Sequence, residues 1–144
     1  MERKRIFPVD VIAVFYFHFN RLHYFSTMHI DEILPFCLHL KGTTESFPFD
    51  QQTLVFKVMG KMYALINVES PDSINLKCDP EMAIDLRERF SAVQPGYHMN
   101  KKHWNTIALN GDLSNDFIQE QIVNSYDLVV KSLPKKLQHE LSIG

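Results

Sequence analysis

The sequence predicts an α+β domain in which a mainly antiparallel sheet has its helices packed on one face. Apolar residues follow helical spacing near position 30, strand spacing from about 53 to 78, and helical spacing again after 79. The predicted strands are joined by short turns, which favours antiparallel pairing between neighbours. The length of 144 residues suits one such domain. The predicted order of elements is α-β-β-β-α-β-β-α.

The first predicted helix covers His29–Leu40. Ile33 and Cys37 lie four residues apart on its apolar face. Pro35 is tolerated only near the first turn of a helix, where few backbone amides are yet hydrogen-bonded. Gly42 then provides the usual glycine stop after the last helical turn.

A hairpin and a third strand follow this helix. Thr53–Val58 and Lys61–Val68 are rich in β-branched and aromatic residues, and Met59-Gly60 between them is a turn. A second turn at Pro71-Asp72 leads into Ser73–Cys78, where apolar and polar residues alternate. These three segments predict a β-meander.

The second half of the chain predicts another helix and another hairpin. Asp79 is a good helix cap and Pro80 suits the first helical position, so a helix is expected from there to about Phe90. After a loop, Tyr97–Asn100 and Trp104–Leu109 are predicted as the two strands of the second hairpin.

A long helix closes the predicted domain. Ser114 is its expected cap, and Ile118, Ile122 and Val129 recur at helical spacing behind it. Pro134–Leu141 predicts a short additional helix at the C-terminus. We find no internal repeat, low-complexity tract or flexible linker in the sequence.

Composition narrows the class of protein. Hydrophobic residues make up 45% and charged residues 22% of the chain, which is ordinary for a globular protein. The net charge of -2 excludes a strongly basic nucleic-acid-binding tail. Cys37 and Cys78 provide neither a disulfide framework nor a four-ligand zinc site, as is typical of a reducing compartment. We therefore expect a cytoplasmic protein.

Residues 1–27 differ from residues 28–144. They carry four Lys and Arg against two acids, so the remaining residues have a net charge of -4. Their longest uninterrupted apolar run, Val11–Phe17, is far shorter than the roughly 20 residues of a membrane-spanning helix. Asp10 and the missing cleavage site argue against a signal peptide. Residues 1–27 are either an extra packed element or an N-terminal extension before a domain that begins at Met28.

Several motifs of this domain resemble those of the MmcQ/YjbR family. In chain order they are Thr53–Val58 (TLVFKV), Lys61–Leu65 (KMYAL), Leu76–Glu81 (LKCDPE), Pro95–Thr106 (PGYHMNKKHWNT), Ser125–Val130 (SYDLVV) and Leu133–Lys136 (LPKK). The similarity extends from about Met28 to Lys136, and the motif that contains the single Trp is the most specific. Residues 1–27 have no counterpart in it.

The resemblance implies a frataxin-type, CyaY-like α+β sandwich. This fold is also compared with the double-wing DNA-binding domain of a phage transcription factor, and the family is labelled DNA-binding on that basis. Fold alone does not imply function. The resemblance brings no catalytic residues with it.

A polar and aromatic cluster within the most specific motif predicts nucleic-acid binding. Lysines suit phosphate contacts, amide and imidazole groups suit bases and sugars, and aromatic rings stack on bases. Lys57 and Lys61 flank the turn of the first hairpin and extend the prediction to a second basic wing. The candidate DNA-binding residues are Lys57, Lys61, Tyr97, His98, Asn100, Lys101, Lys102, His103, Trp104 and Asn105.

The same cluster permits two other interpretations. In the first, Tyr97 and Trp104 belong to the core, while His98 and Asn100 satisfy backbone groups in a tight turn. In the second, residues 97–106 line a polar and aromatic pocket for a small molecule or a protein partner.

The sequence contains no catalytic or metal-binding motif that we recognise. It lacks a nucleophile elbow, a Walker loop and the helical zinc motif. His98 and His103 match no strong template for metal ligands. Frataxins bind iron through an acidic ridge on the first helix, where this chain offers only Asp31 and Glu32. We expect a monomeric binding protein rather than an enzyme, without cofactor or metal.

Overall fold

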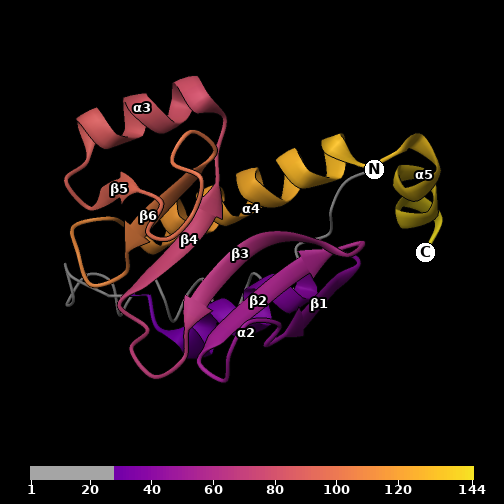
Figure 1. Ribbon diagram of the computed structural model, residues 1–144, viewed down its shortest axis with the longest axis horizontal. Coiled ribbons are helices and arrows are strands. Elements are labelled where there is room, and N and C mark those ends of the chain that lie inside the picture. The colour runs from indigo at the N-terminus through magenta and orange to yellow at the C-terminus, as the bar shows by residue number, and fades with distance from the viewer. Residues whose placement is uncertain (1–27) are drawn as a thin grey trace, which may run out of the picture.

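The computed structural model describes residues 28–144 and has an α+β architecture with a six-stranded antiparallel sheet (Figure 1). The described helices are α2 (Ile30–His39), α3 (Pro80–Arg89), α4 (Asn115–Ser132) and α5 (Lys135–Ile143). The strands are β1 (Thr43–Ser46), β2 (Thr53–Val58), β3 (Lys61–Asn67), β4 (Ser73–Lys77), β5 (Val93–Pro95) and β6 (Trp104–Ala108). The predicted fold class is confirmed. Both interpretations of residues 1–27 concern a segment outside the described residues.

The sheet has the strand order β1-β2-β3-β4-β6-β5. Every neighbouring pair in this order is antiparallel. Strand β6 therefore lies between β4 and β5, although it follows both of them in the chain. Helices α2 and α4 lie on one face of the sheet, which is the far face in the view of Figure 1.

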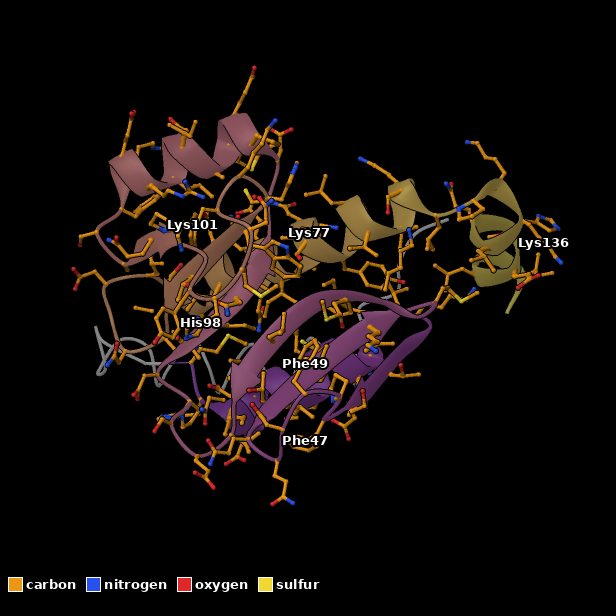
Figure 2. All side chains as sticks on the ribbon, viewed as in Figure 1. Phe47, Phe49, Lys77, His98, Lys101 and Lys136 are labelled. Atoms are coloured by element: carbon orange, nitrogen blue, oxygen red, sulfur yellow. The ribbon has the colours of Figure 1, made fainter. Side chains whose placement is uncertain are left out.

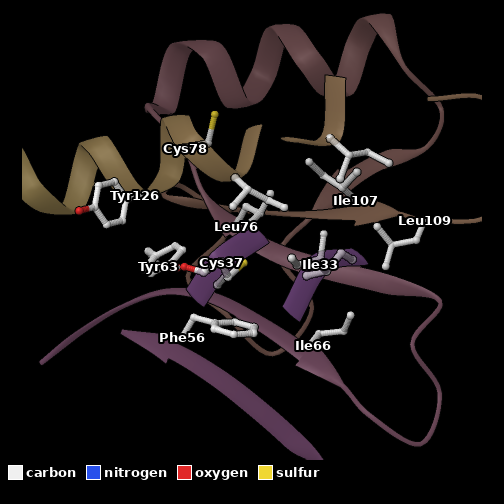
Figure 3. Packing of buried hydrophobic residues seen from close by; sticks show 14 of the residues in the cluster. Ile33, Cys37, Phe56, Tyr63, Ile66, Leu76, Cys78, Ile107, Leu109 and Tyr126 are labelled. Atoms are coloured by element: carbon white, nitrogen blue, oxygen red, sulfur yellow. Dashed lines mark hydrogen bonds between the residues drawn. The ribbon is translucent and has the colours of Figure 1, made fainter. Parts of the chain in front are cut away.

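The apolar core fills the space between these helices and the sheet. Phe56, Ile66 and Leu76 point toward the helices from β2, β3 and β4, and they join Ile33 of α2 and Ile122 of α4 (Figure 3). Burying each such side chain stabilises the fold by about 1.5–3 kcal/mol. Because side chains alternate along a strand, the residues between them point to the opposite face of the sheet.

Helix α2 begins where the sequence predicts. The backbone N–H of His29 donates to Glu32 Oε2 at 2.9 Å, and this acid also suits the positive end of the helix. Pro35 lies in the second turn rather than the first, where the prediction had allowed it. Pro35 has no N–H to donate to the Asp31 carbonyl four residues earlier. Asp31 is exposed, so water can hydrogen-bond to this carbonyl instead.

A β-bulge in the first hairpin turns two consecutive residues, Tyr63 and Ala64, toward the core. The Tyr63 hydroxyl donates to the Cys37 carbonyl at 3.2 Å and lies 3.0 Å from Thr43 Oγ1. Its ring meets the Tyr126 ring edge-on, with 5.4 Å between their centres. One side chain of β3 thus connects α2, β1 and α4.

Both cysteines are free thiols with buried side chains. Burial raises the pKa of the Cys37 thiol to about 12. Burial raises the pKa of the Cys78 thiol as well, and the neighbouring Asp79 carboxylate adds to the effect. Both thiols are therefore protonated at neutral pH and fill space in the core.

Two predictions about strands were wrong. Tyr97–Asn100 is a loop, and the first strand of the second hairpin is Val93–Pro95, within the segment predicted as a loop. His98 has a φ of 56°, a left-handed conformation that is incompatible with an extended strand. Thr43–Ser46 was not predicted as a strand, because its four residues have no apolar alternation.

The remaining helices agree with the predictions. Asp79 Oδ1 caps α3 by accepting from the backbone N–H groups of Glu81 and Met82, and Ser114 caps α4. The short C-terminal helix is confirmed as α5, and its Leu141 joins the main core. Among residues 28–144, no helix has the length and apolar character needed to cross a membrane.

Candidate nucleic-acid interface

The sheet face opposite α2 and α4, here called the open face, carries the residues of interest. Its apolar centre consists of Val55, Leu65 and Trp104, against which Met62 and Met99 pack. Strand by strand, the open-face side chains are Thr44, Ser46, Thr53, Val55, Lys57, Met62, Leu65, Asn67, Ser73, Asn75, Lys77, Gln94, Trp104, Thr106 and Ala108.

The described strands place two lysines and no carboxylate on the open face. Glu45 is the single acid in these strands, and it pairs with Phe56, whose side chain points into the core. Lys57 and Lys77 stand on the open face with β3 between their strands. Lys77 Nζ lies 5.8 Å from the centre of the Trp104 ring, within cation–π range. The side chains of the described strands thus contribute two positive charges to the open face, and the Asp50 carboxylate of the loop after β1 stands beside it, where it accepts from Thr53 Oγ1 at 3.0 Å.

Loop 96–103, which joins β5 to β6, is fastened to the open face. The Tyr97 N–H donates to Thr106 Oγ1 at 2.9 Å, and Asn75 Nδ2 donates to the Tyr97 carbonyl at 3.4 Å. The Thr106 hydroxyl donates in turn to Asn75 Oδ1 at 2.5 Å. A Cβ at Gly96 would lie 2.8 Å from Trp104 Cβ, so only glycine fits this close approach. The loop follows the sheet surface and is not a projecting hairpin.

Arg87 of α3 holds the loop from its other side. Its Nε donates to Asn105 Oδ1 at 2.7 Å, and its Nη2 donates to the carbonyl of Trp104 at 3.2 Å and to that of Lys101. Hydrogen bonds from a charged donor contribute about 1.5–3 kcal/mol each. This role was not predicted, because Arg87 and Asn105 are 18 residues apart and no local sequence pattern connects them.

The structure divides the predicted cluster into exposed and buried residues. Trp104 is 6% exposed and Asn105 is 1% exposed, so neither side chain is accessible as the DNA-binding prediction required. Tyr97 is 68% exposed, which excludes the interpretation that placed it in the core. Its ring centre lies 4.0 Å from that of His98. The other exposed residues of the cluster are His98, Asn100, Lys101, Lys102 and His103.

Two of the exposed side chains also stabilise the loop. Lys101 Nζ donates to the Gly96 carbonyl at 3.0 Å. Asn100 Oδ1 accepts from the Lys102 backbone N–H at 2.9 Å, as the tight-turn interpretation of Asn100 predicted. Within residues 28–144, the Lys102 ammonium donates no comparable hydrogen bond to the loop backbone, and both lysines are exposed.

Lys57 and Lys61 do not form a single basic wing. Lys57 pairs with Met62 on the open face, whereas Lys61 pairs with Val58, whose side chain lies in the core. Residues that pair directly across an antiparallel sheet point to the same face, so these two lysines point to opposite faces. The structure therefore brings Lys57 onto the same face as loop 96–103 and leaves Lys61 out.

Three residues of this surface were absent from the predicted site. Phe47 and Phe49 follow β1 and are 47% and 64% exposed, and Lys77 ends β4. Figure 2 shows Phe49 over β2 and β3, with Lys77 and His98 over the other half of the sheet. The alternation in β4 was a usable signal, because it puts Lys77 on the face opposite Leu76. Another usable signal was the Phe47-Pro48-Phe49 sequence, which lies between two polar segments.

A shallow groove of about 190 Å³ lies elsewhere, beside the start of α3 and along α4. Its lining residues are Cys78, Asp79, Met82, Asn124, Asp127, Leu128 and Lys131. It shares no residue with segment 97–106, where the alternative interpretation expected a pocket. Within residues 28–144, no group of three or more His, Cys, Asp and Glu side chains is arranged to hold a metal ion.

Comparison with known proteins identifies the family. The YjbR family model matches residues 38–128. This chain belongs to the YjbR family. The YjbR protein of Escherichia coli strain K12 is 34% identical over 110 residues, which cover 76% of this chain and 93% of that protein. YbdF of Escherichia coli O157:H7 is 34% identical over 99 residues, which cover 68% of this chain and 81% of that protein.

Solved structures support the same assignment for this YjbR-family chain. A Deinococcus radiodurans protein with a DUF419 domain superimposes with a TM-score of 0.75 at 39% identity, over 81% of this chain and 89% of that chain. A Pseudomonas syringae protein superimposes with a TM-score of 0.61 at 28% identity, over 70% of this chain and 98% of that chain. The YjbR and YbdF relatives are uncharacterized, so family membership by itself carries no activity.

Proposed function

We propose that this YjbR-family protein is a DNA-binding module that uses the open face of its sheet together with loop 96–103. The observation that carries the proposal is the charge of this face. Lys57 and Lys77, both half-buried, stand on it, and the described strands place no carboxylate there, while Asp50 of the flanking loop accepts from Thr53 Oγ1. Contacts to phosphate supply much of the affinity of DNA-binding proteins. Exposed Lys102 and Tyr97 at the loop add a cation and an aromatic ring.

DNA binding by the open face is compatible with the net charge of -4 for residues 28–144, because the acidic side chains of α3 and the basic side chains of this face lie on different parts of the surface. Exposed acids such as Glu81, Asp85 and Glu88 lie on α3, away from the open-face strands. Affinity depends on how many phosphates are neutralised, and this face offers few cations. We therefore expect modest affinity with clear salt dependence.

The proposed surface differs from the one predicted from sequence. It gains Lys77, whose strand position puts it beside Trp104. It loses Lys61, which points to the other face, and the buried side chains of Trp104 and Asn105. The proposal describes a monomeric binding protein of the cytoplasm and not an enzyme, and the two free cysteines favour that reducing compartment.

The test is fluorescence anisotropy with labelled DNA, titrated at several salt concentrations on the full chain. The variant Lys57→Gln with Lys77→Gln removes both open-face cations. If each lysine contacts one phosphate, the slope of log affinity against log salt should fall by about 2 in this variant. The companion variant Lys101→Gln with Lys102→Gln tests the loop in the same way.

A matched control is Lys135→Gln with Lys136→Gln. These two exposed lysines lie on α5, and Figure 2 shows Lys136 far from Lys77 and His98. The control makes the same change in net charge, so it should leave the slope unchanged. The proposal fails if the natural sequence binds no DNA at low salt, or if the control weakens binding as much as the open-face variant does.

A further inference from the structure

Exposed aromatic rings lie on both halves of the open face. Phe49, after β1, is 64% exposed, and Tyr97, in loop 96–103, is 68% exposed. Scattered exposed apolar residues are common on protein surfaces and need no explanation. Here, however, Lys57 of β2 and Lys77 of β4 stand on the same face of the sheet as these two rings. The combination of aromatic platforms with cations is the pattern by which proteins bind single-stranded nucleic acid.

The fastening of loop 96–103 argues against a duplex as the ligand. A wing that enters a groove of duplex DNA must project from the protein, because bases in a duplex are reached only from the groove edges. Thr106 and Asn75 bind the loop backbone at Tyr97 on one side, and Arg87 binds its carbonyls on the other. The exposed ring of Tyr97 therefore stands on a part of the loop whose backbone is held against the sheet. Such a ring can stack on a base only when that base is unpaired.

We propose that the DNA recognised by this face is single-stranded, with bases stacked on Phe49 and Tyr97 and phosphates held by Lys57 and Lys77. This inference rests on the proposed DNA-binding function and names the form of DNA. The four strands from β2, over which Phe49 lies, to β6, which binds the loop at Tyr97, span about 14 Å at about 4.8 Å per strand interval. That width suits the lower end of the roughly 4–16 nucleotides bound by other single-strand-binding domains.

The experiment compares a labelled oligothymidylate of about 12 nucleotides with a duplex of the same length, at one low salt concentration. The single strand should bind at least about tenfold more tightly than the duplex. Phe49→Ala and Tyr97→Ala should each weaken single-strand binding by about tenfold, because one stacked base is lost. Both variants should weaken duplex binding less than they weaken single-strand binding, because a paired base cannot stack on either ring.

Two controls separate stacking from general surface effects. Tyr97→Phe keeps the ring and should retain single-strand affinity. Ile84→Ala removes a 55% exposed apolar side chain from α3 and should change neither affinity. All four changes are at exposed positions, and thermal unfolding checks that each variant folds.

The outcomes distinguish this inference from the proposed function. If the protein binds neither single-stranded nor duplex DNA, both the inference and the proposed function are overturned. Duplex binding as tight as single-strand binding would preserve the proposed function and overturn the inference. Tight single-strand binding that survives both Phe49→Ala and Tyr97→Ala would overturn the assigned stacking residues.

Discussion

Among single residues, Asn105 shows how burial changes the role of a side chain. Its amide type suits base recognition, which is why the sequence placed it in the binding site. In the fold its Oδ1 accepts from Arg87 and its Nδ2 donates to the Ala83 carbonyl at 3.5 Å. The amide thus has partners at both ends inside the protein, and a buried amide without them would cost about 1–3 kcal/mol. Asn105 therefore positions loop 96–103 instead of contacting a ligand.

Arg87 gives a test of this role. We expect Arg87→Ala to lower the free energy of unfolding by about 2–3 kcal/mol, because it removes the hydrogen bonds to the loop and leaves Asn105 Oδ1 unpaired. Urea denaturation followed by circular dichroism measures the change. Arg89→Ala on the same helix is the control: its exposed pair with Asp85, at 3.1 Å, should contribute less than about 0.5 kcal/mol. Equal effects of the two substitutions would show that Arg87 does not fasten the loop.

Among elements, helix α4 is tied to the sheet by one buried hydroxyl. Ser125 Oγ donates to the Tyr63 carbonyl of β3 at 2.5 Å and accepts from the Lys77 N–H of β4 at 2.8 Å. This N–H is that of Lys77, whose side-chain ammonium stands on the open face. The helix on one face of the sheet therefore helps to position a candidate contact on the other.

Ser125→Ala should lower the free energy of unfolding by about 1–3 kcal/mol, since it leaves two backbone groups near the core without their partner. Chemical denaturation measures this as well. Ser132→Ala near the end of α4 is the matched control, because its exposed hydroxyl donates only to the Val129 carbonyl at 2.7 Å. That control should change stability by less than about 0.5 kcal/mol. A Ser125→Ala protein as stable as the control would mean that apolar packing alone holds α4.

The elements also differ in how far the sequence predicts them. Strands β2, β3 and β4 were predicted because each buries apolar side chains at strand spacing. Strand β1 buries none of its four residues fully, so no pattern marks it, and it exists because β2 offers backbone hydrogen bonds at its edge. The Tyr-His-Met-Asn segment has the composition of a strand, but the left-handed His98 and the fastening to Thr106 keep it a loop.

For the whole molecule, the packing of Met28 bears on the predicted domain boundary. Met28 is 2% exposed and belongs to the main core. We expect a protein that begins at Met28 to fold with an unfolding temperature close to that of the full chain, because this core is then intact. Differential scanning calorimetry of the two proteins gives the comparison. A fall of many degrees in the shorter protein would show that residues 1–27 contribute to the core.

The surface as a whole could be predicted only in part. The lysines and aromatic residues of segment 97–104 were found from sequence because they are adjacent in the chain. Phe49 was missed, because it joins this surface only through the sheet, and Lys77 was one of several basic residues that could extend the patch and was not singled out among them. Lys61 was predicted to share this surface with Lys57. Its pairing with Val58 shows instead that it points to the other face of the sheet.

The fold class, the positions of α2, α3 and α4, and the first hairpin were all predictable from the sequence. Apolar spacing, capping residues and turn residues act between neighbours in the chain, so they are readable without a structure. The position of β6 between β4 and β5, the hydrogen bond from Arg87 to Asn105 and the shared face of Lys57 and Lys77 became visible only in the folded structure. Each of these depends on contacts between distant segments, and a strand carries no local mark of the partner beside which it will lie.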